Sequence, residues 1–125
     1  MKILLSLAAA LITGCSTIDY SSPPPADFPK LAITVHEYDD IAGARTACAA
    51  RYDAYGIEMP AFLVACSEYR FDTMTCDIHV PRGDSYLLTY EHAKCAGYNN
   101  AGDTSTVDRW MAWKSLRGVQ QKWNP

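Results

Sequence analysis

Five cysteines in 125 residues constrain this chain more than any other feature of its sequence. A single domain of this size buries little surface, so covalent cross-links contribute a large share of its stability. The number is odd, which leaves at least one cysteine without an intrachain partner if the others form disulfides. The position of the unpaired cysteine therefore bears on the compartment of the protein, and the pairing of the other four constrains its fold.

The N-terminal segment accounts for the odd cysteine. A lysine is followed by an apolar, uncharged run over residues 3–12 and by two small residues before Cys15. This pattern is typical of a cleaved signal peptide, spanning residues 1–14, and the run is too short to cross a bilayer. The run Ile12-Thr13-Gly14-Cys15 resembles the lipobox of bacterial lipoproteins.

That resemblance implies a specific fate for Cys15. It implies cleavage before this residue, a diacylglyceryl group on its sulfur, and acylation of the new amine by a fatty acid such as palmitate, which together give stable membrane anchoring. Ser16, in a position where aspartate retains lipoproteins at the inner membrane, implies transfer to the outer membrane with the domain facing the periplasm or the surface. A soluble secreted protein with a chance cysteine is the alternative.

Composition and charge narrow the possible partners. Eleven Lys and Arg against fourteen Asp and Glu give a net charge of -3, which argues against nucleic-acid binding because that requires a basic surface. Residues 16–30 contain four prolines and few residues to bury. We therefore expect residues 15–30 to form a lipidated, partly extended tether, reaching on the order of 40 Å, and residues 31–125 to form one domain.

The pattern of apolar residues predicts an α+β domain of order β-α-β-β-α-α, with a β-hairpin packed on helices. Alternation predicts a half-buried strand over residues 31–37, with Ile33 and Val35 on its buried side. Helical periodicity predicts a helix from Ile41 to about Tyr55, capped by Asp40. The residues expected on its buried face are Ile41, Ala44, Cys48, Tyr52 and Tyr55.

The second half of the domain is expected to hold the hairpin and two further helices. Strand-like runs over residues 61–68 and 73–80 are separated by a short polar turn, which predicts a hairpin. The second run places Met74, Cys76, Ile78 and Val80 on one face, expected to meet the helices, and Thr75, Asp77 and His79 on the other. A helix over about 86–95, capped by Asp84 or Ser85, and another from Ser105, with a capping-box arrangement to Asp108, complete the order.

The four remaining cysteines are Cys48, Cys66, Cys76 and Cys95, and we expect two disulfides among them. No CxxC occurs, so a tetrathiolate zinc site has little support. A hairpin centred on Phe71 would place Cys66 opposite Cys76 and leave Cys48 for Cys95. A cross-strand bridge of that kind is strained. The pairs Cys48 with Cys66 and Cys76 with Cys95 therefore remain open.

One helical segment carries possible chemistry. The run Tyr90-Glu91-His92-Ala93-Lys94-Cys95-Ala96-Gly97-Tyr98-Asn99-Asn100 resembles the HExxHxxGxxH helix and turn of zincin-type metallopeptidases, with the glutamate and the glycine in place. The histidine ligands of that motif are replaced by Tyr90, Lys94 and Asn100. Lys94 puts an ammonium where Zn²⁺ would lie, so the resemblance implies a zincin-like domain without metal or other cofactor and without catalysis.

The resemblance also implies a site. Glu91 occupies the position of the general base and is the candidate catalytic residue if any activity remains. The residues Tyr90, Glu91, Lys94, Tyr98 and Asn100 would line a cleft, and Glu91 could form an ion pair with Lys94 one turn away.

Two other interpretations remain open at this stage. The same side chains can form an ordinary solvated helix face. A rearranged metal site could instead use Glu91, His92 and either His79 or Asp103, although His92 points about 100° around the helix from Glu91.

The sequence therefore favours an outer-membrane-anchored lipoprotein whose domain binds a peptide or another envelope component without cutting it. The alternatives are a metallopeptidase-like enzyme with replaced ligands and a purely structural envelope lipoprotein. Of the tryptophans Trp110, Trp113 and Trp123, at least one is expected on the surface as a possible partner contact. Neither the ligand nor the oligomeric state follows from the sequence.

Overall fold

The computed structural model describes residues 17–123, and the side chains of residues 17–117. Cys15, the expected lipidation site, lies outside the described residues. The elements follow the expected β-α-β-β-α-α order and form a small α+β fold. They are β1 (Ala32–Tyr38), α2 (Ile41–Ala54), β2 (Cys66–Arg70), β3 (Thr75–Pro81), α3 (Ser85–Cys95) and α4 (Ser105–Trp123).

The chain divides into two compact units, which we describe separately. One unit comprises residues 29–95 and holds the sheet with α2 and α3. The other combines residues 17–28 with residues 96–123, including α4.

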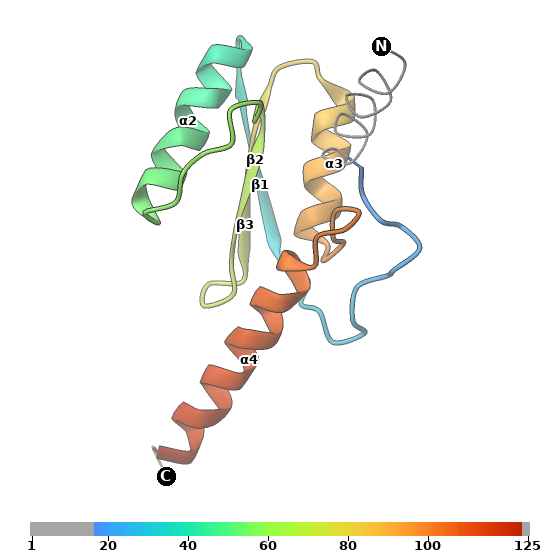
Figure 1. Ribbon diagram of the computed structural model, residues 1–125, viewed down its shortest axis with the longest axis vertical. Helices are drawn as coiled ribbons and strands as arrows, with labels where there is room; N and C mark the ends of the chain where they lie inside the picture. Colours follow the sequence, from blue (N-terminus) through green and yellow to red (C-terminus); the bar gives the residue numbers. More distant parts are fainter. Residues whose placement is uncertain (1–16, 124–125) are drawn as a thin grey trace, which may run out of the picture. The chain divides into compact units, whose positions relative to one another are not determined.

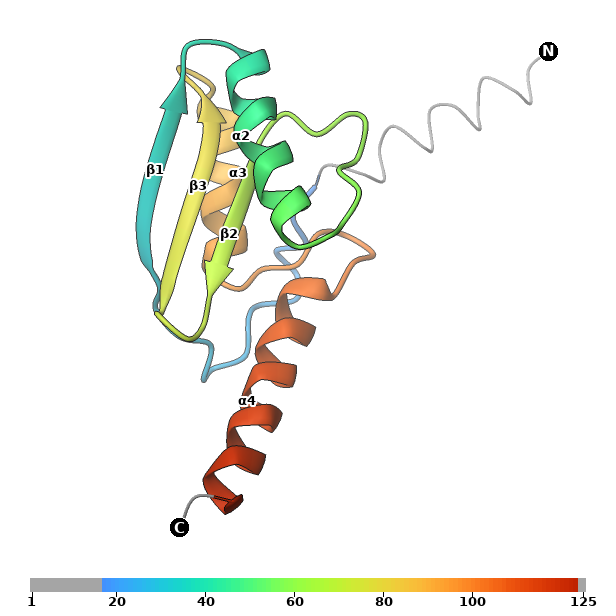
Figure 2. The same ribbon diagram turned by 90° about the vertical axis from the view of Figure 1, so that its left-hand side faces the viewer.

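The three strands form one mixed sheet of order β1-β3-β2. β1 pairs with β3 in parallel, and β2 pairs with β3 in antiparallel orientation. α2 covers one face of this sheet and α3 covers the other (Figures 1 and 2). β3 lies in the middle, so its side chains are enclosed on both faces: Cys76, Ile78, His79 and Val80 are all buried. The apolar face of this strand meets α3 as expected, and His79 on the opposite face is buried as well.

Two disulfides tie the helices to the sheet. Cys48 of α2 bonds Cys66 of β2, and Cys76 of β3 bonds Cys95 of α3. The pairing of Cys66 with Cys76 that a hairpin centred on Phe71 suggested was wrong, because the hairpin has a different register: Cys66 lies opposite His79, and Cys76 lies opposite Tyr69. One disulfide therefore lies on each face of the sheet and joins it to the helix on that face.

The register differs because the turn extends further than the sequence predicted. Met74, expected in the second strand, has a φ of 55° and belongs to the turn before β3. β2 begins at Cys66, and residues 61–65 lie in the loop before it. Arg45 of α2 holds this loop by donating hydrogen bonds from Nη1 to the carbonyl oxygens of Ala61 and Leu63.

Local capping signals act largely as expected. Asp40 accepts a hydrogen bond from Gly43 N at 2.8 Å at the start of α2, and Gly56, with a φ of 66°, follows its end. Asp84 caps α3 by accepting from Leu87 N at 2.9 Å. The start of α4 differs, because the Thr104 hydroxyl, rather than Ser105, donates to Asp108 Oδ2.

β1 and α2 are more open than the periodicity predicted. Ile33 and Val35 are 40 % and 37 % exposed, because α3 packs on β3 and β2 and does not extend over β1. In α2 only Ala44 and Cys48 are buried, while Ile41 and Tyr55 are exposed.

The second unit pairs part of the expected tether with the chain that follows α3. Asp19 N donates to Asn99 O, and Ala101 N donates to Thr17 O, both at 2.9 Å. The Phe28 ring lies 6.0 Å from that of the buried Trp110. Residues 17–28 are therefore held by hydrogen bonds and packing rather than extended as free chain. Within residues 17–123, no helix has the length and apolar character needed to cross a membrane.

Candidate functional site

α3 carries the segment that resembles the zincin helix, and it directs Glu91 into the protein. This side chain is 2 % exposed and faces β2. Tyr90 and Lys94 are half-buried, with Lys94 Nζ 5.9 Å from the centroid of the Tyr90 ring. His92 is exposed to solvent. Of the two charged candidates in this helix, the carboxyl is thus enclosed and the ammonium remains near the surface.

The surroundings of Glu91 disfavour its charged form. Burial raises the pKa of Glu91, while Lys94 and Ser67 of β2 act in the opposite direction. Glu91 Oε2 and Ser67 Oγ are nevertheless enclosed without a hydrogen bond of ordinary geometry. The predicted ion pair between Glu91 and Lys94 is not formed among the described side chains. A carboxyl held in this way is a poor general base, because it is shielded from water.

The residues that replace the zincin ligands do not fit a zinc ion. Lys94 offers a protonated amine and Tyr90 a phenol, and neither matches the imidazoles that zinc prefers. Among the side chains described, those of residues 17–117, no group of three or more His, Cys, Asp or Glu is placed to hold a metal ion. The alternative site with His79 is not assembled, because His79 lies on the α2 face of the sheet, opposite Cys66, whereas Glu91 lies on the α3 face.

The remaining candidates of the motif belong to the second unit. The Tyr98 ring lies 5.3 Å from that of Tyr20. Asn100 forms isolated β-bridges with Ile18 and with Asp103, and Asp103 Oδ1 accepts a hydrogen bond from Ser105 N. These contacts give Tyr98, Asn100 and Asp103 structural roles in joining the N-terminal segment to the start of α4.

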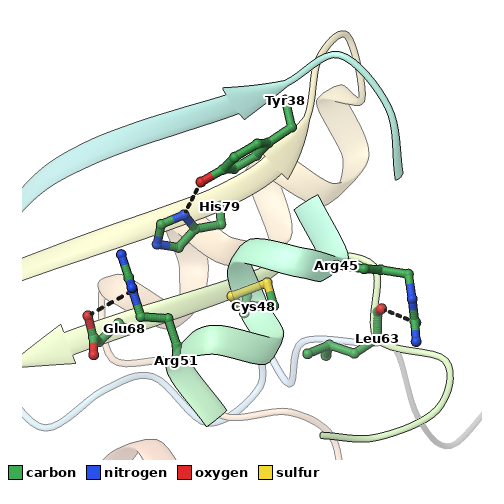
Figure 3. Close-up of a disulfide and its surroundings, with 8 residues drawn as sticks. Tyr38, Arg45, Cys48, Arg51, Leu63, Glu68 and His79 are labelled. Atoms are coloured by element: carbon green, nitrogen blue, oxygen red, sulfur yellow. Dashed lines mark hydrogen bonds and ion pairs between the residues drawn. A yellow bond between two sulfur atoms is a disulfide. The ribbon is translucent and has the colours of Figure 1, made fainter. Parts of the chain in front are cut away.

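A polar cluster that the sequence did not predict as a unit lies between the sheet and α2 (Figure 3). His79 Nδ1 is 2.9 Å from the Tyr38 hydroxyl, and the His79 ring stacks on His36 at 4.7 Å. His36 Nε2 in turn pairs with Asp77 Oδ1 at 2.9 Å. The parallel register of β1 and β3 produces this arrangement, since it places His36 beside His79.

An ion-pair group extends the cluster toward β2. Glu68 is buried and lies 2.9 Å from Arg70 Nη2 and 3.6 Å from Arg51 Nε of α2. The Tyr55 hydroxyl donates to Glu68 Oε2 at 2.6 Å, and this bond raises the pKa of Tyr55. Glu68 is therefore compensated by two cations and one hydroxyl, as a buried carboxylate requires.

The enclosure of His79 limits what the cluster can do chemically. Burial lowers the pKa of His79, and the neighbouring His36 and Arg51 lower it further. Because its pKa lies below the ordinary value of 6.5, His79 is neutral near pH 7, and its side chain is shielded from solvent at 1 % exposure. The cluster is best understood as a polar layer that positions α2 on the sheet. The alternation along β3 predicted the face of Asp77 and His79, but it gave no sign of the partners from β1.

Comparison of the chain with protein-family models, with curated proteins and with solved structures found no match.

Proposed function

We propose that this chain is a lipoprotein of the bacterial cell envelope, anchored by lipid on Cys15 to the outer membrane, whose domain binds an extended peptide or protein partner without cleaving it. The observation that carries the proposal is the lipobox-like run Ile12-Thr13-Gly14-Cys15 directly after an apolar segment. It accounts for the odd cysteine and assigns a compartment.

The disulfides support that compartment. Disulfides persist in oxidising surroundings such as the bacterial periplasm and are rare in the reducing cytosol. The chain has four cysteines after Cys15, and all four pair, as Cys48–Cys66 and Cys76–Cys95. A domain exported in this way also needs such cross-links, because its sheet has only three strands.

Binding is favoured over catalysis by the chemistry of α3. The zincin-like frame has Lys94 where a metal ligand would stand, and its ammonium lies over the Tyr90 ring. Glu91, the residue in the general-base position, is enclosed with its charged form disfavoured. A zincin-like domain with these substitutions keeps a sheet and a helix for recognition and lacks the means to activate water.

The anchor is tested with the full chain expressed in a bacterium with two membranes. We expect mass spectrometry to find a diacylglyceryl group on Cys15 and the chain in the outer-membrane fraction. Cys15→Ser should leave the chain unlipidated and release it from that fraction. Ser16→Asp is the matched control, because it keeps the lipid and should shift the chain to the inner membrane. An unmodified Cys15 in the wild-type chain would refute the anchor.

The absence of catalysis is tested on the same preparation, purified without chelators. We expect no stoichiometric zinc and no cleavage of a casein substrate beyond that of the Glu91→Gln variant. Stoichiometric zinc together with cleavage that Glu91→Gln abolishes would support the enzyme alternative.

A further inference from the structure

β1 leaves one edge of the sheet open. At one end of β1, Ala32 N donates to Met74 O, and at the other end Tyr38 O accepts from Arg82 N. The even-numbered residues of β1 therefore bond to β3, since peptide groups alternate in direction along a strand. The outward N–H and C=O groups belong to Ile33, Val35 and Glu37, and none of them has a hydrogen-bond partner in the part of the chain described.

The same three residues present an accessible face beside this edge. Their side chains point to the α3 face of the sheet, because Ile33, Val35 and Glu37 are in register with Cys76, Ile78 and Val80. α3 covers β3 and β2 only, as Figure 2 shows. The side chains of Ile33 and Val35 therefore form an apolar strip next to unpaired backbone groups. This combination is what strand addition uses, with backbone bonds for affinity and side chains for selectivity.

The strip ends in a hollow at the C-terminal end of β1. Its volume is about 160 Å³, and Glu37, Val80, Asp84 and Leu88 are among its lining residues. Three carboxylates lie at this end, on Glu37, Asp39 and Asp84. They are opposed by one cation, Arg82, which lies 3.8 Å from Glu37 and 3.1 Å from Asp39. The hollow thus combines an apolar floor with an excess of negative charge, which suits a long basic side chain.

We propose that β1 binds an extended peptide segment of the form basic-x-apolar-x-apolar, added antiparallel to the strand. Three hydrogen-bonded residue pairs would use every outward group of Ile33, Val35 and Glu37. An antiparallel segment places its first residue opposite Glu37, where the acidic hollow takes the basic side chain. Its two apolar side chains then cover Val35 and Ile33. This proposal rests on the proposed binding function and names the surface and the partner chemistry.

The test uses the full chain purified in detergent and a fluorescein-labelled peptide, lysine-threonine-valine-threonine-isoleucine flanked by serines. Binding is followed by fluorescence anisotropy, with detergent alone as the blank. Val35→Pro removes an outward N–H without touching the ladder to β3, and we expect it to weaken binding roughly tenfold or more. Thr34→Lys, on the opposite face of the same strand, is the matched control and should change affinity less than about twofold.

A charge exchange tests the orientation and does not depend on the proline variant. Glu37→Lys should weaken binding of the lysine peptide roughly tenfold and should favour a peptide with glutamate in place of that lysine. A peptide of reversed sequence should bind more weakly than the original, because it would place its basic residue beside Ile33.

Several results would overturn the proposal. They are no binding by the wild-type chain, unchanged binding by a Val35→Pro variant that melts like the wild type, and tighter binding of the reversed peptide. A dimer of the chain alone in sedimentation, lost in Val35→Pro, would assign the edge to a second copy instead. Lipidation of Cys15 and the lack of turnover are measured separately, so failure here leaves the anchor and the non-catalytic domain standing.

Discussion

Glu91 is a carboxyl group that the fold encloses with no hydrogen-bond partner for Oε2. Burial raises its pKa above the ordinary value of 4.5. The folded chain therefore keeps the Glu91 proton to higher pH than the unfolded chain does. Protonation of Glu91 favours the folded state fully below pH 4.5, and this stabilisation is lost as pH rises through the folded-state pKa. The residue that resembles a catalytic base thus lowers stability at neutral pH.

Replacing this carboxyl by an amide tests that reasoning. We expect Glu91→Gln to increase the free energy of unfolding by about 1–3 kcal/mol at pH 8 and to change it little at pH 4, where the wild-type group is protonated in both states. Urea unfolding at the two pH values measures the difference. In the same experiment, Lys94→Met should destabilise the wild-type chain at pH 8 but not the Glu91→Gln variant, because the ammonium favours the charged form of Glu91. An equal change in the free energy of unfolding of Glu91→Gln at pH 4 and pH 8 would contradict the buried, raised-pKa carboxyl.

His79 makes stability depend on pH in the opposite direction. Its folded-state pKa lies below the ordinary value of 6.5, so the unfolded chain takes up a proton on this residue at a higher pH than the folded chain does. We expect the melting temperature to fall between about pH 7.5 and pH 5.5, and the fall to be smaller in His79→Gln. His92→Gln, at an exposed histidine, is the control and should leave the change of melting temperature with pH as it is in the wild type. A slope that persists in His79→Gln would assign the effect to other groups.

At the scale of elements, the two disulfides each hold one helix against one face of the sheet. They close loops of similar length, with sequence separations of 18 and 19 residues. Removing either pair by double substitution to alanine should cost about 3 kcal/mol, since the loop-closure entropies are nearly equal. Peptide mapping of the unreduced chain should recover only Cys48 with Cys66 and Cys76 with Cys95. A fragment that joins Cys66 to Cys76 would contradict the hairpin register.

Local sequence patterns predicted which segments form helices and strands, but they did not predict the pairing register of the β2–β3 hairpin. The periodicity of residues 41–55 and the Asp40 and Gly56 signals predicted α2 closely, because capping and helical spacing are local. The hairpin register required the position of the turn. The left-handed conformation of Met74 moves that turn toward the C-terminus, a choice that a β-sheet makes through long-range pairing.

The exposure of β1 also could not be read from alternation. Ile33 and Val35 alternate as a half-buried strand does, but α3 packs on β3 and β2 and not on β1. Burial depends on which element packs over a strand, and the strand's own sequence does not contain that information. The lack of cover by α3 leaves the side chains of Ile33 and Val35 accessible beside the open edge that is proposed as a peptide site.

At the scale of the whole molecule, residues 17–28 connect the expected anchor to the fold, and a glycine governs their packing. Gly97 has a φ of 100°, and an added Cβ would lie 2.7 Å from the Phe28 ring and 2.8 Å from Pro24. We expect Gly97→Ala to loosen residues 17–28 and to make chymotrypsin cleavage after Tyr20 faster, because both strain and steric overlap oppose the packed state. Gly102→Ala has a similar φ of 76° with open space around the Cβ, and should have a smaller effect.

The sequence by itself determined the class of the fold, the capping of α2 by Asp40 and the division of five cysteines into one near the N-terminus and four in the domain. These features depend on neighbours within a few residues or on counting. The tertiary structure decided which cysteines pair, which face of each strand is covered, and that Glu91 is enclosed while His36, Tyr38, Asp77 and His79 meet. Those outcomes depend on strand register and layer packing, which join residues far apart in the chain through the summed burial of many side chains.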